Sequence, residues 1–204
     1  MKFYNSMGPN PQVVRMFAAE RGITLDMEEV DLMGGENRQE AYLQKNPGGQ
    51  LPCLELDDGS YLAEITAICE YLDEIADGPK LLGETPEARA MNRMWTRRID
   101  LYICEPLATG FRGTEGRALF ENRMTLLSPE ACGDLKALAQ EKITWLDSLM
   151  EGHDYLGGDA PSLPDILLFC FLAFGNSVGQ PLNEANKNVS AWFERMSGRA
   201  SASA

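Results

Sequence analysis

The sequence has a single histidine, His153, and its five cysteines include no Cys-x-x-Cys pair. Zinc sites need three or four ligands, which Cys and His usually supply at short spacing. The cysteines are odd in number and scattered, so they suit the reduced thiols of a cytoplasmic protein rather than a disulfide framework. The sequence therefore predicts no metal site, and His153 beside Gly152 is expected at the surface.

Long apolar runs are also missing. The longest, Ile166–Phe174, is far shorter than the roughly 20 residues that cross a bilayer. Met1 leads directly into a strand pattern, without the apolar region of a signal peptide. Lys and Arg number 18 against 31 Asp and Glu, and the net charge of −13 disfavours nucleic acid or an anionic membrane as a partner. We expect a cytoplasmic protein that binds neither.

The most informative stretch is Asn46–Leu72, NPGGQLPCLELDDGSYLAEITAICEYL. Its opening Asn-Pro-Gly-Gly predicts a turn. Two strand candidates, Pro52–Leu56 and Ser60–Leu62, flank an Asp-Gly pair, which is a strong hairpin signal. From Ile65 onward the apolar residues fall at helical spacing. The stretch therefore predicts a turn, an antiparallel hairpin and a helix that begins beside Glu64.

The corner where this helix begins has the chemistry to bind an α-amino acid. The first peptide N–H groups of a helix lack partners and attract a carboxylate, and Glu64 beside them could pair with an ammonium. Gln50 and the backbone of Leu51 could bind the main chain of a peptide. A hairpin and a helix that only pack together remain the alternative.

The chain upstream alternates strand and helix patterns. Strand patterns at Lys2–Asn5 and Ile23–Val30 are separated by a helix that ends at Gly22, and a short polar helix is expected over Glu36–Gln44. With the hairpin and its helix, the order is βαβαββα. This is a thioredoxin-like pattern, with a βαβ crossover and an antiparallel edge.

The chain downstream of a Gly- and Pro-rich linker is expected to be helical. Met91 and Ile103 belong to the apolar stripe of a long helix that Pro106 would kink or end. Ser162-Leu163-Pro164-Asp165 is a capping box before the longest apolar run, so we expect this helix at the centre of a bundle. Ser162 and Asp165 are therefore assigned structural roles.

Two of these motifs carry a resemblance to a known family. The Asn46–Leu72 stretch resembles the glutathione-binding half of the cytosolic glutathione transferases, whose pattern is Asn-Pro-x-Gly-x-Val-Pro, a hairpin and Glu-Ser-x-x-Ile. The Ser-x-x-Asp box is similar to that of their C-terminal domain. The resemblance implies a bacterial-type member, of open class, with an α/β thioredoxin-like N-terminal domain and an all-α C-terminal helical bundle (the glutathione-transferase fold). The implied boundaries are residues 1–76, a linker at 77–86, and an all-helical domain at 87–204.

The resemblance also implies how glutathione would bind. It implies a cis peptide bond after Leu51, whose backbone would pair with the cysteinyl unit, and tripeptide contacts at Gln50 and Glu64. Ile65 departs from the pattern, because the family usually has a serine there whose hydroxyl helps hold the γ-glutamyl carboxylate. The peptide N–H of Ile65 could still serve, and Thr66 could supply a hydroxyl.

Asp100 is a further candidate for glutathione binding. In several family classes an acidic residue at this place reaches the γ-glutamyl ammonium bound by the partner subunit of a homodimer. The alternative is an ion pair of Asp100 with Arg97 or Arg98 at the surface. Both interpretations stay open.

The residue that activates the thiol is expected in the loop that enters the first helix. A free thiol has a pKa near 8.5, so a hydrogen-bond donor or a helix N-terminus must stabilise its thiolate at neutral pH. The first candidate is Asn10, which stands where the cysteine-using bacterial class has its thiol. Ser6, a hydroxyl at the strand end, is the second, and Tyr4, which lines up with the tyrosine of other classes, is the third.

Each of these candidates has a structural alternative. Asn10 before Pro11 could be the N-cap of the helix. Ser6 could be only a turn residue, and Tyr4 could belong to the hydrophobic core. The loop contains no cysteine, which disfavours thiol-exchange enzymes, because their chemistry needs a nucleophilic sulfur of their own.

The implied function is conjugation of the glutathione thiolate to small hydrophobic electrophiles by a homodimer, with glutathione-dependent peroxidase activity as an accessible second reaction. The helical domain would contribute the electrophile pocket. One rival is a non-catalytic, transferase-fold binding or regulatory protein. The other is a specialised glutathione-dependent lyase, isomerase or dehalogenase, although the loop lacks the Ser-Ser-Cys-Ser motif of the isomerases.

Overall fold

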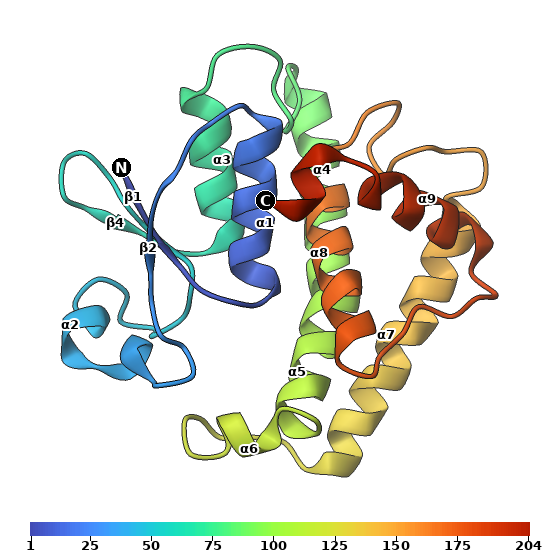
Figure 1. Cartoon of the computed structure of the whole chain (residues 1–204). Coiled ribbons are helices and arrows are strands. Elements are labelled where there is room, and N and C mark those ends of the chain that lie inside the picture. Colours follow the sequence, from blue (N-terminus) through green and yellow to red (C-terminus); the bar gives the residue numbers. More distant parts are fainter. The chain divides into compact units, whose positions relative to one another are not determined.

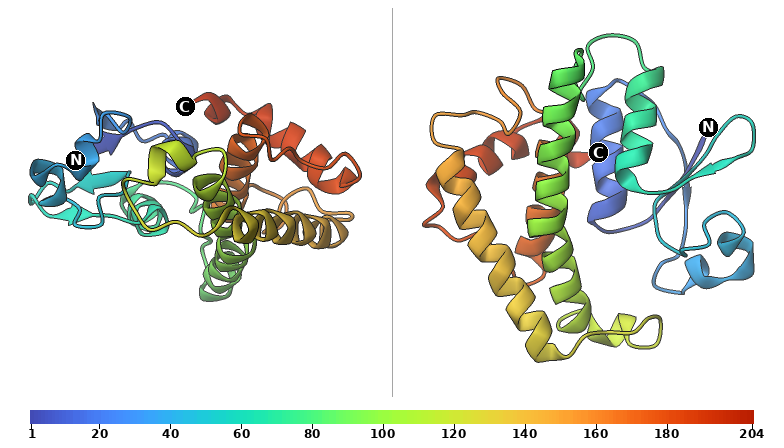
Figure 2. Two further views of the ribbon diagram at one scale, coloured as in Figure 1. Left: turned by 90° about the horizontal axis from the view of Figure 1, so that it is seen from below. Right: turned by 180° about the vertical axis from the view of Figure 1, so that it is seen from behind.

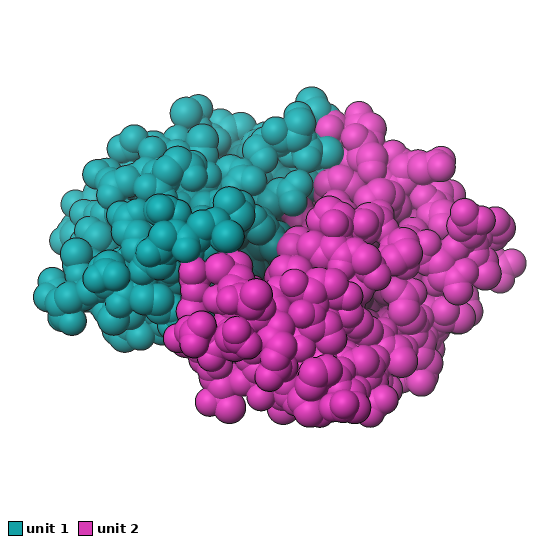
Figure 3. Space-filling view, turned by 60° about the horizontal axis from the view of Figure 1, so that its bottom comes forward, with its two compact units in different colours: residues 1–82, 200–204 teal, residues 83–199 magenta.

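The computed structural model describes all 204 residues, which form two compact units. Unit 1 contains Met1–Leu82 together with Ala200–Ala204, and unit 2 contains Gly83–Arg199 (Figure 3). None of the helices has both the length and the apolar composition of a membrane-spanning segment.

Unit 1 follows the predicted order βαβαββα (Figure 1). Its elements are β1 (Lys2–Asn5), α1 (Pro9–Glu20), β2 (Asp26–Glu29), a 3-10 turn (Glu36–Arg38), α2 (Glu40–Leu43), β3 (Cys53–Glu55), β4 (Tyr61–Leu62) and α3 (Ile65–Ile75). The predicted second strand, Ile23–Val30, is shorter in the structure because the Ile23 N–H bonds to the Ala18 carbonyl and completes the end of α1. A second 3-10 turn, Ala200–Ser203, packs on α1.

The four strands form one sheet in the order β2-β1-β3-β4. β1 is parallel to β2 and antiparallel to β3, and β3 is antiparallel to β4. Phe3 pairs with Leu54 and both are fully buried, whereas Tyr4 and Cys53 point to the opposite face, since neighbouring strand residues alternate. Helices α1 and α3 lie side by side on one face of the sheet (Figures 1 and 2).

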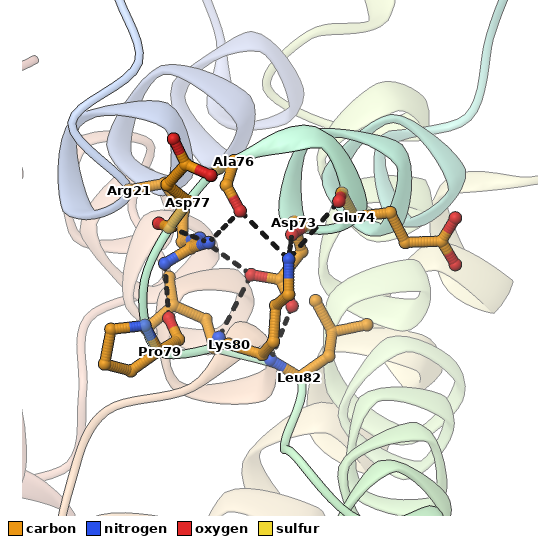
Figure 4. Close-up of polar contacts among 9 residues, drawn as sticks. Arg21, Asp73, Glu74, Ala76, Asp77, Pro79, Lys80 and Leu82 are labelled. Atoms are coloured by element: carbon orange, nitrogen blue, oxygen red, sulfur yellow. Dashed lines mark hydrogen bonds and ion pairs between the residues drawn. The ribbon is translucent and has the colours of Figure 1, made fainter.

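A buried ion pair closes the C-terminal end of α3 (Figure 4). The Asp73 carboxylate lies 2.9 Å from Nε of Arg21, and both side chains are 5% exposed. The Arg21 Nε–H group is not aligned for a hydrogen bond with this carboxylate, so the contact is an ion pair only. The same carboxylate accepts the peptide N–H groups of Leu81 at 3.0 Å and Leu82 at 3.2 Å. Asp73 therefore ties the segment after α3 back onto the helix.

Two cations also bind carbonyl groups in the last turn of α3 and just after it. Lys80 Nζ donates to the carbonyls of Asp73 at 2.6 Å and Ala76 at 2.9 Å. Arg21 donates to those of Ala76 at 3.1 Å and Asp77 at 3.2 Å. Positive charge at a helix C-terminus is favourable, so the cluster both neutralises Asp73 and caps α3.

We expect Asp73→Asn to lower the free energy of unfolding by about 3–5 kcal/mol, because it leaves the Arg21 cation buried without its partner. Urea denaturation followed by circular dichroism measures this. The control is Asp77→Asn, an exposed carboxylate on the same segment, for which a change below about 0.5 kcal/mol is expected. An effect of Asp73→Asn no larger than the control would contradict the role assigned to the ion pair.

Unit 2 is all-helical, as predicted. Its elements are α4 (Pro86–Ile99), a π-helical turn (Asp100–Cys104), α5 (Glu105–Gly113), α6 (Arg117–Phe120), α7 (Pro129–Leu149), α8 (Leu163–Ser177) and α9 (Lys187–Ser197). Pro106 does not end the long helix, because the π-helical turn lets the backbone continue past the residue that lacks an N–H.

The predicted central helix is α8, which is buried along most of its length. Asp165 accepts the peptide N–H of Ser162 at 3.0 Å, so the capping box is present. The carboxylate is fully buried and also accepts the N–H groups of Leu156 at 2.9 Å and of the Trp192 indole at 3.0 Å. Asp165 therefore joins α8, α9 and the loop before α8, which confirms a structural role.

Candidate functional site

The sheet register brings three chain segments to one edge of unit 1. β1 leads from Asn5 through a short loop into α1. β3 runs antiparallel to β1 with Tyr4 opposite Cys53, so the residues just before β3 lie at the same edge. β4 pairs Leu62 with Leu54, so the chain leaves β4 for α3 at this edge as well. The start of α1, the Leu51-Pro52 segment and the start of α3 therefore converge.

The segment before β3 is held from within the chain. The Leu51–Pro52 peptide bond is cis, as the resemblance implies. The Gln50 carbonyl accepts the Tyr42 hydroxyl at 2.7 Å and the Asn46 side-chain amide at 2.9 Å, which turns this carbonyl inward, while the Gln50 side chain is exposed. The strand ladder begins only at Cys53, so the Leu51 peptide lies beyond it.

The start of α3 has an unusual backbone. Glu64 is the only non-glycine residue with a positive φ, 67°, and serves as N-cap without a side-chain capping bond. Such a conformation costs roughly 1–3 kcal/mol and is concentrated at functional sites. Ile68 is the first residue whose N–H bonds within the helix, to the Glu64 carbonyl at 2.9 Å. The N–H groups of Ile65 and Thr66 are therefore available to an anion.

The start of α1 leaves one peptide donor. Gly8 is the N-cap, with φ 107°, and the helix continues with Pro9, Asn10 and Pro11. Because proline has no N–H, Asn10 alone contributes a peptide N–H at these three helical positions. The alternative that Asn10 is the N-cap is wrong, since the helix begins before it. The peptide N–H of Asn10 and its half-buried side-chain amide are therefore both candidates to donate to a ligand at the start of α1.

The hydroxyl groups of Ser6 and Tyr4 already donate within the chain. Ser6 Oγ donates to the Val30 carbonyl at 3.1 Å and is almost fully buried. The Tyr4 hydroxyl donates to Glu55 at 2.6 Å and accepts from Lys45 at 3.1 Å. Burial, with a smaller contribution from Glu55, raises the pKa of Tyr4. Either residue would have to give up its present bond to serve a thiolate.

All five cysteines are free and buried. Burial raises the pKa of the Cys53 thiol to about 11 and raises that of Cys104 as well. The unit 1 thiol nearest the candidate site in sequence is thus held as the neutral form at neutral pH. A nucleophilic sulfur at this edge would have to come from a ligand.

Arg38 is a candidate that the sequence analysis missed. A Cβ built on Gly49 would lie 2.9 Å from the Arg38 Nη1 atom, so this guanidinium lies against the loop that leads to Leu51. The Arg38 Nε atom is buried without an acceptor. Asn37 holds the same loop through a 2.6 Å bond to the Gly49 carbonyl. The available signal was a basic residue in a polar helix just before the Asn-Pro-Gly-Gly turn.

Asp100 lies in unit 2, in the π-helical turn. Its carboxylate is 3.8 Å from Arg97 Nη1, and its side chain is 36% exposed. The predicted alternative, an ion pair with Arg97, is thus present. An exposed pair at this distance contributes little to stability.

Comparisons with known proteins place both units of the chain in one family. Residues 7–75 match the family model of the glutathione S-transferase N-terminal domain, and residues 134–200 match that of the C-terminal domain. Glutathione S-transferase 2 of Saccharomyces cerevisiae is 32% identical over 201 residues, which cover 95% of this chain and 84% of the yeast protein.

Two further matches are informative. The crystal structure of a glutathione S-transferase domain-containing protein from Marinobacter aquaeolei superposes with a TM-score of 0.93 at 33% identity, covering 99% of this chain and 100% of the other. Maleylacetoacetate isomerase of Pseudomonas aeruginosa is 43% identical over 82 residues, 39% of each chain. These matches confirm the predicted fold class.

Proposed function

The chain belongs to the glutathione S-transferase family, and we propose that it transfers the thiolate of glutathione to small hydrophobic electrophiles. Glutathione is the co-substrate, and reduction of peroxides by the same thiolate is a second activity of the site. The observation that carries the proposal is the convergence of the Leu51 peptide, the start of α3 and the start of α1 at one edge of the sheet.

We assign the γ-glutamyl unit to the start of α3. Its carboxylate would accept the free N–H groups of Ile65 and Thr66, and its ammonium would pair with the Glu64 carboxylate. The missing serine hydroxyl at Ile65 is then compensated by backbone donors or by the Thr66 hydroxyl. In a homodimer, Asp100 of the second copy would add a second negative charge near the ammonium.

The remaining units extend along the loop before β3. The cysteinyl unit would form backbone hydrogen bonds with Leu51, as a strand added beyond the ladder does. The glycyl carboxylate would pair with Arg38, and the exposed Gln50 side chain would bond to the peptide. This places an anion on a guanidinium that has no intrachain ion pair.

Asn10 is the residue we assign to the thiolate. Its peptide N–H and carboxamide N–H groups would donate to the sulfur and lower its pKa. The thiol proton leaves to solvent, the sulfur lone pair forms the S–C bond, and the leaving group departs with its bonding electrons. The electrophile pocket would come from the helical domain, whose predicted limits are residues 87–204.

We expect Asn10→Ala to reduce kcat/KM with a nitroaryl halide by about 10- to 100-fold, since a lost donor to an ion is equivalent to roughly 1.5–3 kcal/mol. The pKa of bound glutathione, followed by thiolate absorbance, should rise by about one unit or more. Gln12→Ala on the same helix is the control. Unchanged turnover and pKa in a folded Asn10→Ala variant would transfer the assignment to Ser6 or Tyr4.

Arg38→Gln should raise the KM for glutathione by about tenfold or more with little change in kcat, because a charge-assisted bond to a bound carboxylate is lost. γ-Glutamylcysteine, which lacks the glycine, provides a substrate control. Its KM should be the same for the wild type and the variant. An equal effect on both substrates would show that Arg38 acts on the loop rather than on the glycyl carboxylate.

Glutathione-dependent isomerisation is the second candidate, favoured by the 43% identity of the 82-residue match to an isomerase. The Ser6–Pro9 loop lacks the expected Ser-Ser-Cys-Ser motif, which disfavours it. A glutathione-affinity column combined with a nitroaryl-halide assay separates the candidates. Binding without turnover on any electrophile or peroxide would favour a regulatory protein, and a failure to bind glutathione would remove every enzymatic proposal.

A further inference from the structure

Unit 2 contains a cavity of about 280 Å³, and none of the residues that line it is assigned to glutathione. Its walls come from α4, from the last turns of α7 and from the loop that joins α7 to α8. Trp95 and Tyr155 supply aromatic rings, and Leu149 and Met150 supply apolar surface. His153, the only histidine of the chain, also lines it.

The loop that forms one wall is fixed in place. Arg195 of α9 donates to the Asp154 carbonyl at 2.7 Å and forms an ion pair with the Asp154 carboxylate at 2.8 Å. The Leu156 N–H bonds to the buried Asp165 carboxylate at 2.9 Å. The Arg195 guanidinium lies 5.7 Å from the centre of the Tyr155 ring. The cavity is therefore formed before any ligand arrives, which reduces the entropic cost of binding.

The size and the walls select a class of ligand. An apolar cavity of about 150 Å³ holds one benzene ring, so 280 Å³ has room for two fused rings. Aromatic side chains and a methionine thioether favour an aromatic body over an aliphatic one of equal size. The His153 imidazole adds a hydrogen-bonding group to a mainly apolar lining, as in most small-molecule sites.

We propose that this cavity is a second binding site, for a one- or two-ring phenol whose hydroxyl bonds to His153. The site lies within unit 2 and uses no residue assigned to glutathione. Binding should therefore be independent of glutathione, and the proposal holds whether or not the transferase activity does.

The single histidine makes the test direct, because the imidazole Cε1–H proton gives one NMR signal. Titration of the full chain with 1-naphthol should shift this signal saturably, with a dissociation constant below about 1 mM. The saturated analogue 1-decalol should bind at least fivefold more weakly. The shift should persist with saturating S-hexylglutathione present.

Two matched variants locate the site. Leu149 is 44% exposed at the cavity, and Leu138 is 47% exposed on the same helix away from it, so both positions accept a tryptophan without disturbing the core. Leu149→Trp should weaken 1-naphthol binding tenfold or more, and Leu138→Trp less than twofold. His153→Phe, followed by tryptophan fluorescence, should weaken binding of 1-naphthol at least threefold and leave binding of naphthalene unchanged.

Three results would overturn the proposal. They are the absence of a saturable shift, competition by S-hexylglutathione, which would place the naphthol in the electrophile pocket, and equal effects of the Leu149 and Leu138 variants. A phenol that binds no better than decalol would overturn the assigned ligand class.

Discussion

Regular secondary structure leaves peptide groups without partners where helices begin and where strand ladders end, and the candidate site consists largely of such groups. The Leu51 peptide lies beyond the ladder that begins at Cys53, and the first N–H groups of α3 follow the strained Glu64. Two prolines in the first turn of α1 leave Asn10 with the only peptide N–H there. A tripeptide with two carboxylates and one ammonium complements these groups without requiring a net positive protein.

The surrounding side chains keep these backbone groups in place. Tyr42 and Asn46 fix the Gln50 carbonyl, and Asn37 fixes that of Gly49. Far along α3, the Arg21–Asp73 pair secures the other end of the helix. Buried polar groups of this kind are costly when they lose a partner, so the geometry of the site depends on bonds that do not themselves touch a ligand.

The sequence predicted those features whose signals come from residues close together in the chain. The hairpin around Asp-Gly, the helix after Glu64 and the Ser162–Asp165 box all appeared where expected, because their signals are local. The strand at Ile23 was predicted too long, because the Ile23 N–H bonds back to the Ala18 carbonyl and so belongs to the end of α1, one residue beyond the predicted helix end at Gly22. Arg38 was missed because its importance arises only when the fold places it against Gly49. Ser6 and Tyr4 could not be weighed without their partners, the Val30 carbonyl and Glu55.

A crystal structure of the protein with glutathione bound tests the central claim most directly. The account predicts that the cysteinyl backbone forms hydrogen bonds with the Leu51 peptide and that the γ-glutamyl carboxylate accepts the N–H groups at the start of α3. Its sulfur should lie within hydrogen-bonding distance of Asn10. Glutathione bound elsewhere, or with its γ-glutamyl end away from Glu64 and Ile65, would contradict it.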